Sequence, residues 1–90
     1  ELGNEINFWR TKSGLEVDFV LAKGEVAIEV KGSSHVQQRD LRSLKAFVEE
    51  YSPKKALLIC NEREERVQGR IRIIPWRKFL ESLWEGKIIR

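Results

Sequence analysis

The chain has 90 residues, of which 41% are hydrophobic and 34% are charged, a composition that excludes a disordered tail and favours one small globular domain. Seventeen Lys and Arg residues against fourteen Asp and Glu residues give a formal charge of +3, which permits a nucleic-acid partner without requiring one. The apolar runs are far shorter than the roughly 20 residues that span a bilayer, and no signal-peptide pattern opens the chain, so we expect a cytoplasmic protein with no membrane partner.

The use of particular residue types adds three expectations. The chain begins at Glu1 and contains no methionine, so we interpret residues 1–90 as a single domain from the C-terminal part of a longer polypeptide. Its single cysteine, Cys60, excludes an internal disulfide and a cysteine-rich zinc site, and is expected to be a small core residue. The richness in Glu, Lys, Arg, Ile and Val is typical of thermophile proteins.

Three strands in succession are predicted for the first third of the chain. Alternating apolar and polar residues at 5–10 and 15–22 favour two strands joined by a tight turn at 11–14. Lys23-Gly24 is typical of a two-residue hairpin turn, after which 25–31 alternates again. The three strands would therefore form an antiparallel meander. In the second strand we expect one apolar face, Leu15, Val17, Phe19 and Leu21, and an opposite face, Glu16, Asp18, Val20 and Ala22.

A helix is predicted to follow the meander. Ser34 and Gln37 have the spacing of a capping box, and the apolar stripe up to Tyr51 indicates a helix that ends by Ser52-Pro53. The apolar run 56–60 then favours a strand buried on both faces in the middle of a sheet.

The last third is predicted to hold one more strand and one more helix. The charged stretch 61–70 indicates a solvent loop, and 71–74 a strand that ends at Pro75. Residues 76–84 indicate an amphipathic helix that stops at Gly86 and covers the sheet, with Trp76 and Trp84 in the core. The order β-β-β-α-β-β-α predicts an α/β fold, one mixed sheet flanked by helices.

Two acidic residues of the predicted hairpin lie on neighbouring strands, so the side chains of Asp18 and Glu29 are expected to approach each other. Lys31 must point to the same side of the sheet as Glu29, and Glu16 shares the face of Asp18. Like charges opposed on neighbouring strands destabilise a sheet unless a cation neutralises them. The pattern therefore indicates either a metal site or a solvated salt bridge between Lys31 and one of the acids.

A divalent metal would suit these side chains. Mg²⁺ prefers oxygen ligands and is commonly held by one or two carboxylates together with substrate phosphate. Asp18, Glu29 and the main-chain carbonyl of Val30 would bind Mg²⁺ or Mn²⁺, and Lys31 would orient the attacking water or balance charge in the transition state. The arrangement indicates metal-dependent hydrolysis of phosphodiesters.

These residues also resemble a known pattern. Asp18, followed after ten residues by Glu29-Val30-Lys31 and a helix, resembles the core motif of the PD-(D/E)XK nuclease superfamily, to which many restriction endonucleases belong. The longer string from Phe8 to Phe19, FWRTKSGLEVDF, is similar to the uncharacterised C-terminal domain of a family of prokaryotic AAA+ ATPases.

The resemblance implies a restriction-endonuclease-like fold, with Asp18 and Glu29 as metal ligands, Lys31 as catalytic lysine and Glu16 as an additional acid. DNA would be the substrate and an N-terminal ATPase region the partner, and other superfamily members suggest a homodimer. The chain departs from the superfamily in two ways. Val17 stands where a proline often precedes the aspartate, and residues 1–4 are too few to contain the leading helix that often supplies a further acid.

Several alternatives stay open at this point. Gln37, Arg39 and Arg42 are candidate nucleic-acid contacts at the head of the helix, and a solvated helix face explains them equally well. Trp9 suits a base or phosphate contact, although packing at the sheet edge is the expected role. The alternative function is a catalytically silent module with a nuclease fold that serves DNA binding, docking or oligomerisation.

Overall fold

Six strands form one mixed sheet in the computed structural model, which describes residues 7–21 and 24–86. The order across the sheet is β1-β2-β3-β4-β6-β5, with the first three strands antiparallel, as predicted, and β4 parallel to both of its neighbours. A strand between two parallel neighbours has both faces covered, which explains why β4 is a continuous apolar run. The strands are β1 (Asn7–Arg10), β2 (Glu16–Leu21), β3 (Val26–Val30), β4 (Lys55–Cys60), β5 (Arg66–Gln68) and β6 (Ile71–Pro75).

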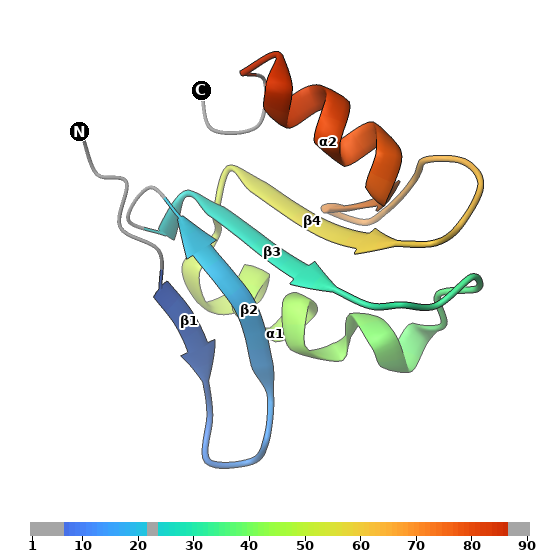
Figure 1. The fold of residues 1–90 in the computed structure, drawn as a ribbon. Helices are drawn as coiled ribbons and strands as arrows, with labels where there is room; N and C mark the ends of the chain where they lie inside the picture. The colour runs from blue at the N-terminus through green and yellow to red at the C-terminus, as the bar shows by residue number, and fades with distance from the viewer. Residues whose placement is uncertain (1–6, 22–23, 87–90) are drawn as a thin grey trace.

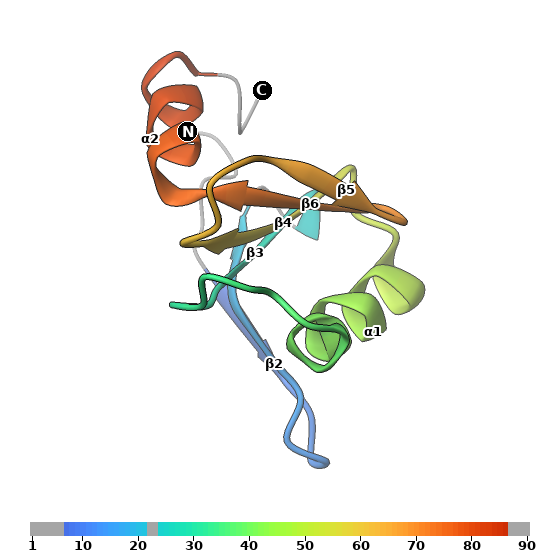
Figure 2. The same cartoon turned by 90° about the vertical axis from the view of Figure 1, so that its right-hand side faces the viewer.

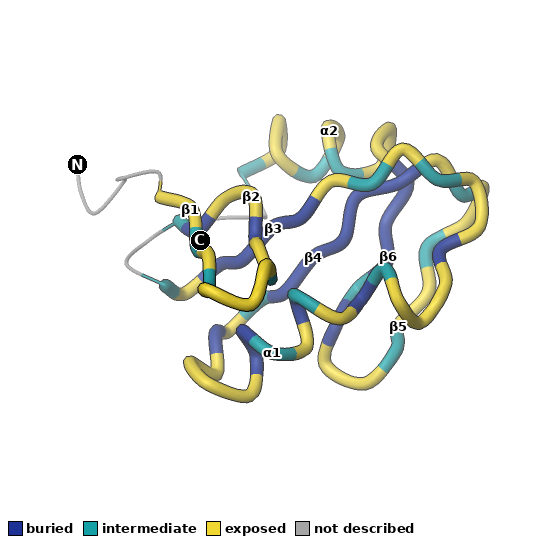
Figure 3. Tube along the Cα trace, turned by 90° about the horizontal axis from the view of Figure 1, so that it is seen from below, coloured by how far each residue is buried: buried dark blue, intermediate teal, exposed yellow. Residues whose placement is uncertain are grey.

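Two helices lie against opposite faces of the sheet (Figures 1 and 2). A short 3-10 turn, η2 (Gln38–Leu41), leads into α1 (Arg42–Tyr51), which connects the parallel strands β3 and β4. The second helix, α2 (Trp76–Trp84), follows β6 directly. The larger core cluster fills the space between the sheet and α1, and a smaller one lies on the α2 side. The central strands are accordingly the most buried part of the chain (Figure 3).

Helix α1 begins later than the sequence predicted. Ser34 does not cap it, because the backbone at Gln37 is still extended and its N–H donates to the Asp40 carboxylate at 2.8 Å. The segment before the helix is held by a different hydrogen bond, which the Val36 N–H donates to the Glu62 carboxylate. The predicted end is confirmed: Ser52 adopts a left-handed conformation with φ 48° after Tyr51.

The predicted faces of β2 are wrong beyond Asp18. Val17 and Val20 are both buried in the α1-side cluster, and Phe19 is 44% exposed. The reason is a register shift against β1: between the pairs Asn7–Val20 and Trp9–Val17, β2 holds one residue more than β1. Such a bulge interrupts the alternation of side chains, and bulges are common beside active sites. Two sequence predictions, Ala22 in this strand and Lys23 in the following turn, fall outside the described residues.

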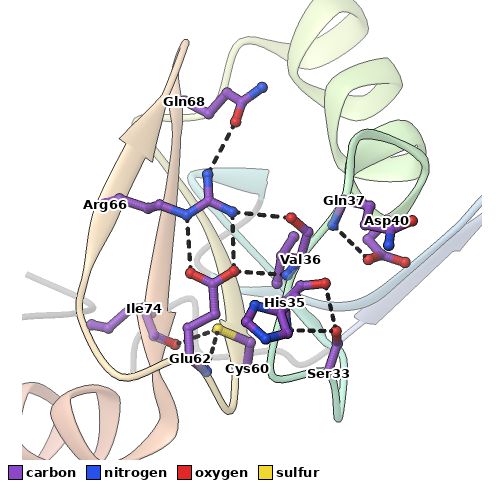
Figure 4. A network of polar contacts seen from close by, with 10 residues as sticks. All are labelled: Ser33, His35, Val36, Gln37, Asp40, Cys60, Glu62, Arg66, Gln68 and Ile74. Atoms are coloured by element: carbon purple, nitrogen blue, oxygen red, sulfur yellow. Dashed lines mark hydrogen bonds and ion pairs between the residues drawn. The ribbon is translucent and has the colours of Figure 1, made fainter.

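The charged stretch 61–70 is not the solvent loop that the sequence predicted, because it contains β5 and a polar clamp (Figure 4). Glu62 and Arg66 pair at 2.9 Å, and both hold the backbone of Val36, whose N–H donates to Glu62 and whose carbonyl accepts from Arg66. The hydrogen bonds from Arg66 lower the pKa of Glu62. The clamp ties the entrance of the helical segment to the carboxyl end of β4.

Helix α2 has the predicted bounds and stops at Gly86, where φ is 75°. Its predicted role in covering the core is largely wrong, because α2 contains no buried residue. Trp76 and Trp84, expected in the core, are 44% and 92% exposed. Phe79 is the α2 residue that packs against the smaller core cluster. By contrast Trp9 packs edge-on against Phe47 of α1, as expected for it.

Candidate active site

The predicted acids meet where β2 and β3 separate. The two strands pair from Leu21–Val26 to Phe19–Ile28, and beyond that pair Asp18 Oδ2 accepts a hydrogen bond from the Val30 N–H at 2.8 Å. The next N–H along the chain, that of Lys31 just after β3, donates to the Ile59 carbonyl of β4. In a strand, the N–H and the carbonyl of one residue point toward the same neighbouring strand. Because the Val30 N–H donates to Asp18, the Val30 carbonyl also faces the side of Asp18.

Glu29 is the buried acid of the site. It lies on the sheet face that α1 covers and is 4% exposed, so its pair with Lys31 is not the fully solvated salt bridge that the sequence left open. Its Oε2 lies 3.2 Å from Lys31 Nζ, whereas its Oε1 is buried and has no hydrogen-bond partner within the described part of the chain. Burial raises the pKa of Glu29, with a smaller opposing effect from Lys31. A carboxylate oxygen in this position is a natural ligand for a cation.

Lys31 completes the predicted trio. Its side chain lies on the same side of β3 as Glu29, as the period of a strand requires, and is 40% exposed. The Lys31 ammonium therefore contacts the buried acid, while part of the Lys31 side chain is open to solvent. A polar hollow of about 250 Å³ brings together all the residues predicted for catalysis and metal binding, and its lining is Gly14, Glu16, Asp18, Glu29, Val30, Lys31 and Ser43.

Glu16 lines this hollow without joining the two other acids in a compact cluster. Its carboxylate lies 4.0 Å from Arg10, and its side chain is 56% exposed. Across residues 7–21 and 24–86, no three side chains of the His, Cys, Asp or Glu type converge closely enough to hold a metal ion by themselves. An ion here would depend on two carboxylates, a backbone carbonyl, water and the substrate.

Sequence reasoning missed two residues of the site, both from the helical segment. Ser43 Oγ accepts the N–H of Glu16 at 3.0 Å and so ties the start of β2 to α1. Asp40 contributes to the raised pKa of Glu29. The signal that would have found them is their spacing, because residues three apart on a helical segment share a face, here the face toward the sheet.

The weaker candidates for nucleic-acid contact lie at and just before the start of α1. Gln37, Arg39 and Arg42 are exposed, and Arg42 directly precedes Ser43 in the lining. Lys45, one turn further on, donates to Gln38 at 3.0 Å. A role for Gln37, Arg39 and Arg42 in binding nucleic acid stays a prediction.

The donor atoms suit a hard cation. Asp18, Glu29 and the Val30 carbonyl offer oxygen only, which is the ligand set of Mg²⁺ and Mn²⁺ and not that of a soft metal. The buried Glu29 Oε1 is the atom that a cation would satisfy. The residues present therefore fit the metal that the sequence predicted.

A family model supplies the relationship of the chain to other proteins. The model of a domain of unknown function, DUF4143, matches residues 1–79. The chain belongs to the DUF4143 family. Searches among curated proteins and among solved structures gave no significant match. No helix in the described part of this DUF4143 domain is long and apolar enough to cross a membrane.

Proposed function

We propose that this DUF4143 domain is a metal-dependent nuclease of the PD-(D/E)XK type, which hydrolyses phosphodiester bonds in DNA. The observation that carries the proposal is the buried Glu29 Oε1, which lacks a partner and lies beside Asp18 and Lys31 where β2 and β3 part. A structural salt bridge alone would leave no reason to bury an unsatisfied carboxylate oxygen.

The arrangement of elements supports a restriction-endonuclease-like fold. An antiparallel meander, β1 to β3, is followed by a crossover helix, α1, and by a parallel strand, β4, in the centre of the sheet. The acids sit toward the carboxyl end of β3, the end at which open α/β sheets bind their ligands.

Each residue then has a chemical role. Asp18, Glu29 and the Val30 carbonyl would hold the ion, with the Val30 N–H keeping Asp18 in place. Bound Mg²⁺ or Mn²⁺ would supply charge to polarise the scissile phosphate and to acidify a water. Lys31 holds its ammonium 3.2 Å from Glu29 Oε2, where it can donate to the attacking water or to a phosphate oxygen.

Calorimetric titration with Mn²⁺ and Mg²⁺ tests the site directly. We expect the native chain to bind the ion and Asp18→Ala and Glu29→Ala to lose that binding. Glu25→Ala is the matched control, because Glu25 also lies in the β2–β3 hairpin and pairs with Lys54 at the opposite end of β3. Binding that survives both site variants would contradict the assignment.

Cleavage of duplex, single-stranded and branched DNA tests the activity. Lys31→Met should keep the ion and lose cleavage, because its ammonium is placed to act on water or phosphate. Absence of both ion binding and cleavage would favour the catalytically silent module, which serves DNA binding, docking or oligomerisation. We include an N-terminal AAA+ ATPase region as partner in the proposal, on the strength of the resemblance in residues 8–19.

A further inference from the structure

Helix α2 presents an apolar stripe to solvent. Its members recur at i, i+4, i+7 and i+8, the spacing of one helix face, and they are 41–92% exposed. Three of them line an apolar hollow of about 540 Å³. Such a contiguous patch is typical of a binding surface and not of the free surface of a small monomer. The stripe consists of Trp76, Leu80, Leu83 and Trp84.

The charges beside the stripe are placed against the helix dipole. Helix α2 has no acidic residue in its first turn and no basic residue in its last turn. Arg77 instead stands in the first turn and Glu81 in the last, one turn apart on the same flank of the stripe. A helix terminus favours the opposite charge by about 0.3–1 kcal/mol, so this order destabilises an isolated α2.

A second α2 packed antiparallel to the first would offset this unfavourable interaction of Arg77 and Glu81 with the helix dipole. Two antiparallel copies related by a two-fold axis between Phe79 and Leu80 would bring equivalent flanks together, so that each Arg77 lies within about one residue of the level of Glu81 of the second copy. The same axis sets Trp76 opposite Leu83 and brings the two Leu80 side chains to within about one residue of each other. Each basic helix start would also lie beside an acidic helix end.

We propose that α2 is the homodimer interface of this chain, formed by antiparallel packing of α2 against α2 of a second copy. The occupant is a second copy because the surface is complementary to itself in both charge order and apolar spacing, which is the property that an isologous interface requires. The contact is small, so we expect a dimer in the micromolar range. It is independent of catalysis at Asp18, Glu29 and Lys31.

Sedimentation analysis of the 90-residue chain over a micromolar to millimolar range measures the dimer. Arg77→Glu should weaken it by about tenfold, because two attractive pairs become repulsive. The same change places an acid in the first turn and so stabilises the helix itself, which separates loss of pairing from loss of folding. Arg63→Glu, on the exposed loop after β4, is the matched control and should leave the dimer intact.

Charge exchange makes the test specific to the antiparallel arrangement. Glu81→Arg alone should also weaken the dimer, whereas the double variant Arg77→Glu, Glu81→Arg should restore it. An equimolar mixture of the two single variants should form a heterodimer for the same reason. A chain that stays monomeric throughout the range, or single variants that do not complement each other, would overturn the proposal.

Discussion

At the scale of single residues, the decisive feature is the burial of Glu29. A carboxylate that is 4% exposed loses hydration, and one hydrogen-bonded lysine satisfies only one of its two oxygens. Burial raises the pKa of the group, so Glu29 binds a proton more readily in the folded chain than in the unfolded chain. A cation shifts this balance back toward the carboxylate, since it satisfies the second oxygen. The buried Glu29 carboxylate therefore lowers the stability of the fold until a cation binds it.

Glu29→Gln should raise the free energy of unfolding at neutral pH by about 1 kcal/mol in the absence of metal, because it removes a buried charge. The sign follows from linkage. With its pKa raised, Glu29 binds its proton more tightly in the folded chain, so its contribution to stability falls as pH rises from the ordinary glutamate pKa through the raised one. The variant should lack that decline, which thermal melts between about pH 5 and pH 8 would reveal.

The same thermal melts with added Mn²⁺, and with a control variant, test whether a metal binds Glu29. Mn²⁺ should raise the melting temperature of the native chain and leave that of Glu29→Gln unchanged. Glu25→Gln, from the exposed end of the same hairpin, should match the native chain in both respects. A Glu29→Gln variant that melts below the native chain at neutral pH without metal would show that the carboxylate is stabilising, against our interpretation.

At the scale of elements, the two helices have similar amphipathic patterns and different roles. Helix α1 buries Leu44, Phe47 and Val48 against the sheet, and covers Glu29 at the same time. Helix α2 buries no residue and meets the sheet through Phe79. The difference arises because α1 crosses between two parallel central strands, whereas α2 follows β6 and leaves much of its stripe outside the core.

Leu44→Ala and Leu80→Ala should separate these roles. Leu44 is fully buried, so its truncation leaves a cavity and should cost about 3–5 kcal/mol. Leu80 is 49% exposed, so its truncation should change stability by no more than about 0.5 kcal/mol in dilute solution. Denaturant unfolding of both variants at low concentration checks this. Equal costs would mean that α2 is part of the monomer core.

At the scale of the whole molecule, the topology gathers the site at one end of the sheet. The carboxyl ends of β3 and β4 lie beside the entrance to α1, where Arg39 and Arg42 are exposed. The net charge of +3 is modest, so DNA binding would depend on where the basic residues lie and not on their total. The opposite end of the sheet carries Lys54 and Arg70 at the starts of β4 and β6.

The double variant Arg39→Ala, Arg42→Ala should weaken DNA binding without regard to sequence. Each lost phosphate contact lowers the slope of log affinity against log salt by about 0.9 for duplex DNA, so the slope should fall by about 2. Lys54→Ala, Arg70→Ala removes the same charge from the far end and is the control. Titrations at several salt concentrations distinguish the two, and equal losses would indicate general electrostatic attraction instead of a located surface.

The sequence by itself determined the type of nearly every element and the place of the two acids in one hairpin. Strand and helix periods are local, so the meander, the central strand β4 and α2 could be predicted with near-correct bounds. The short hairpin between β2 and β3 also places Asp18 near Val30, and the period of two places Lys31 beside Glu29. These relations depend on neighbours within one hairpin.

Tertiary structure decided whatever depends on segments far apart in the chain. The burial of Glu29 comes from α1 packing over its face, and the shifted faces of β2 come from its register with β1. The clamp of Glu62 and Arg66 forms because β4 ends beside the segment before α1. An amphipathic pattern states that a helix has an apolar face but not what covers it, which is why α2 was expected inside the core and lies largely outside it.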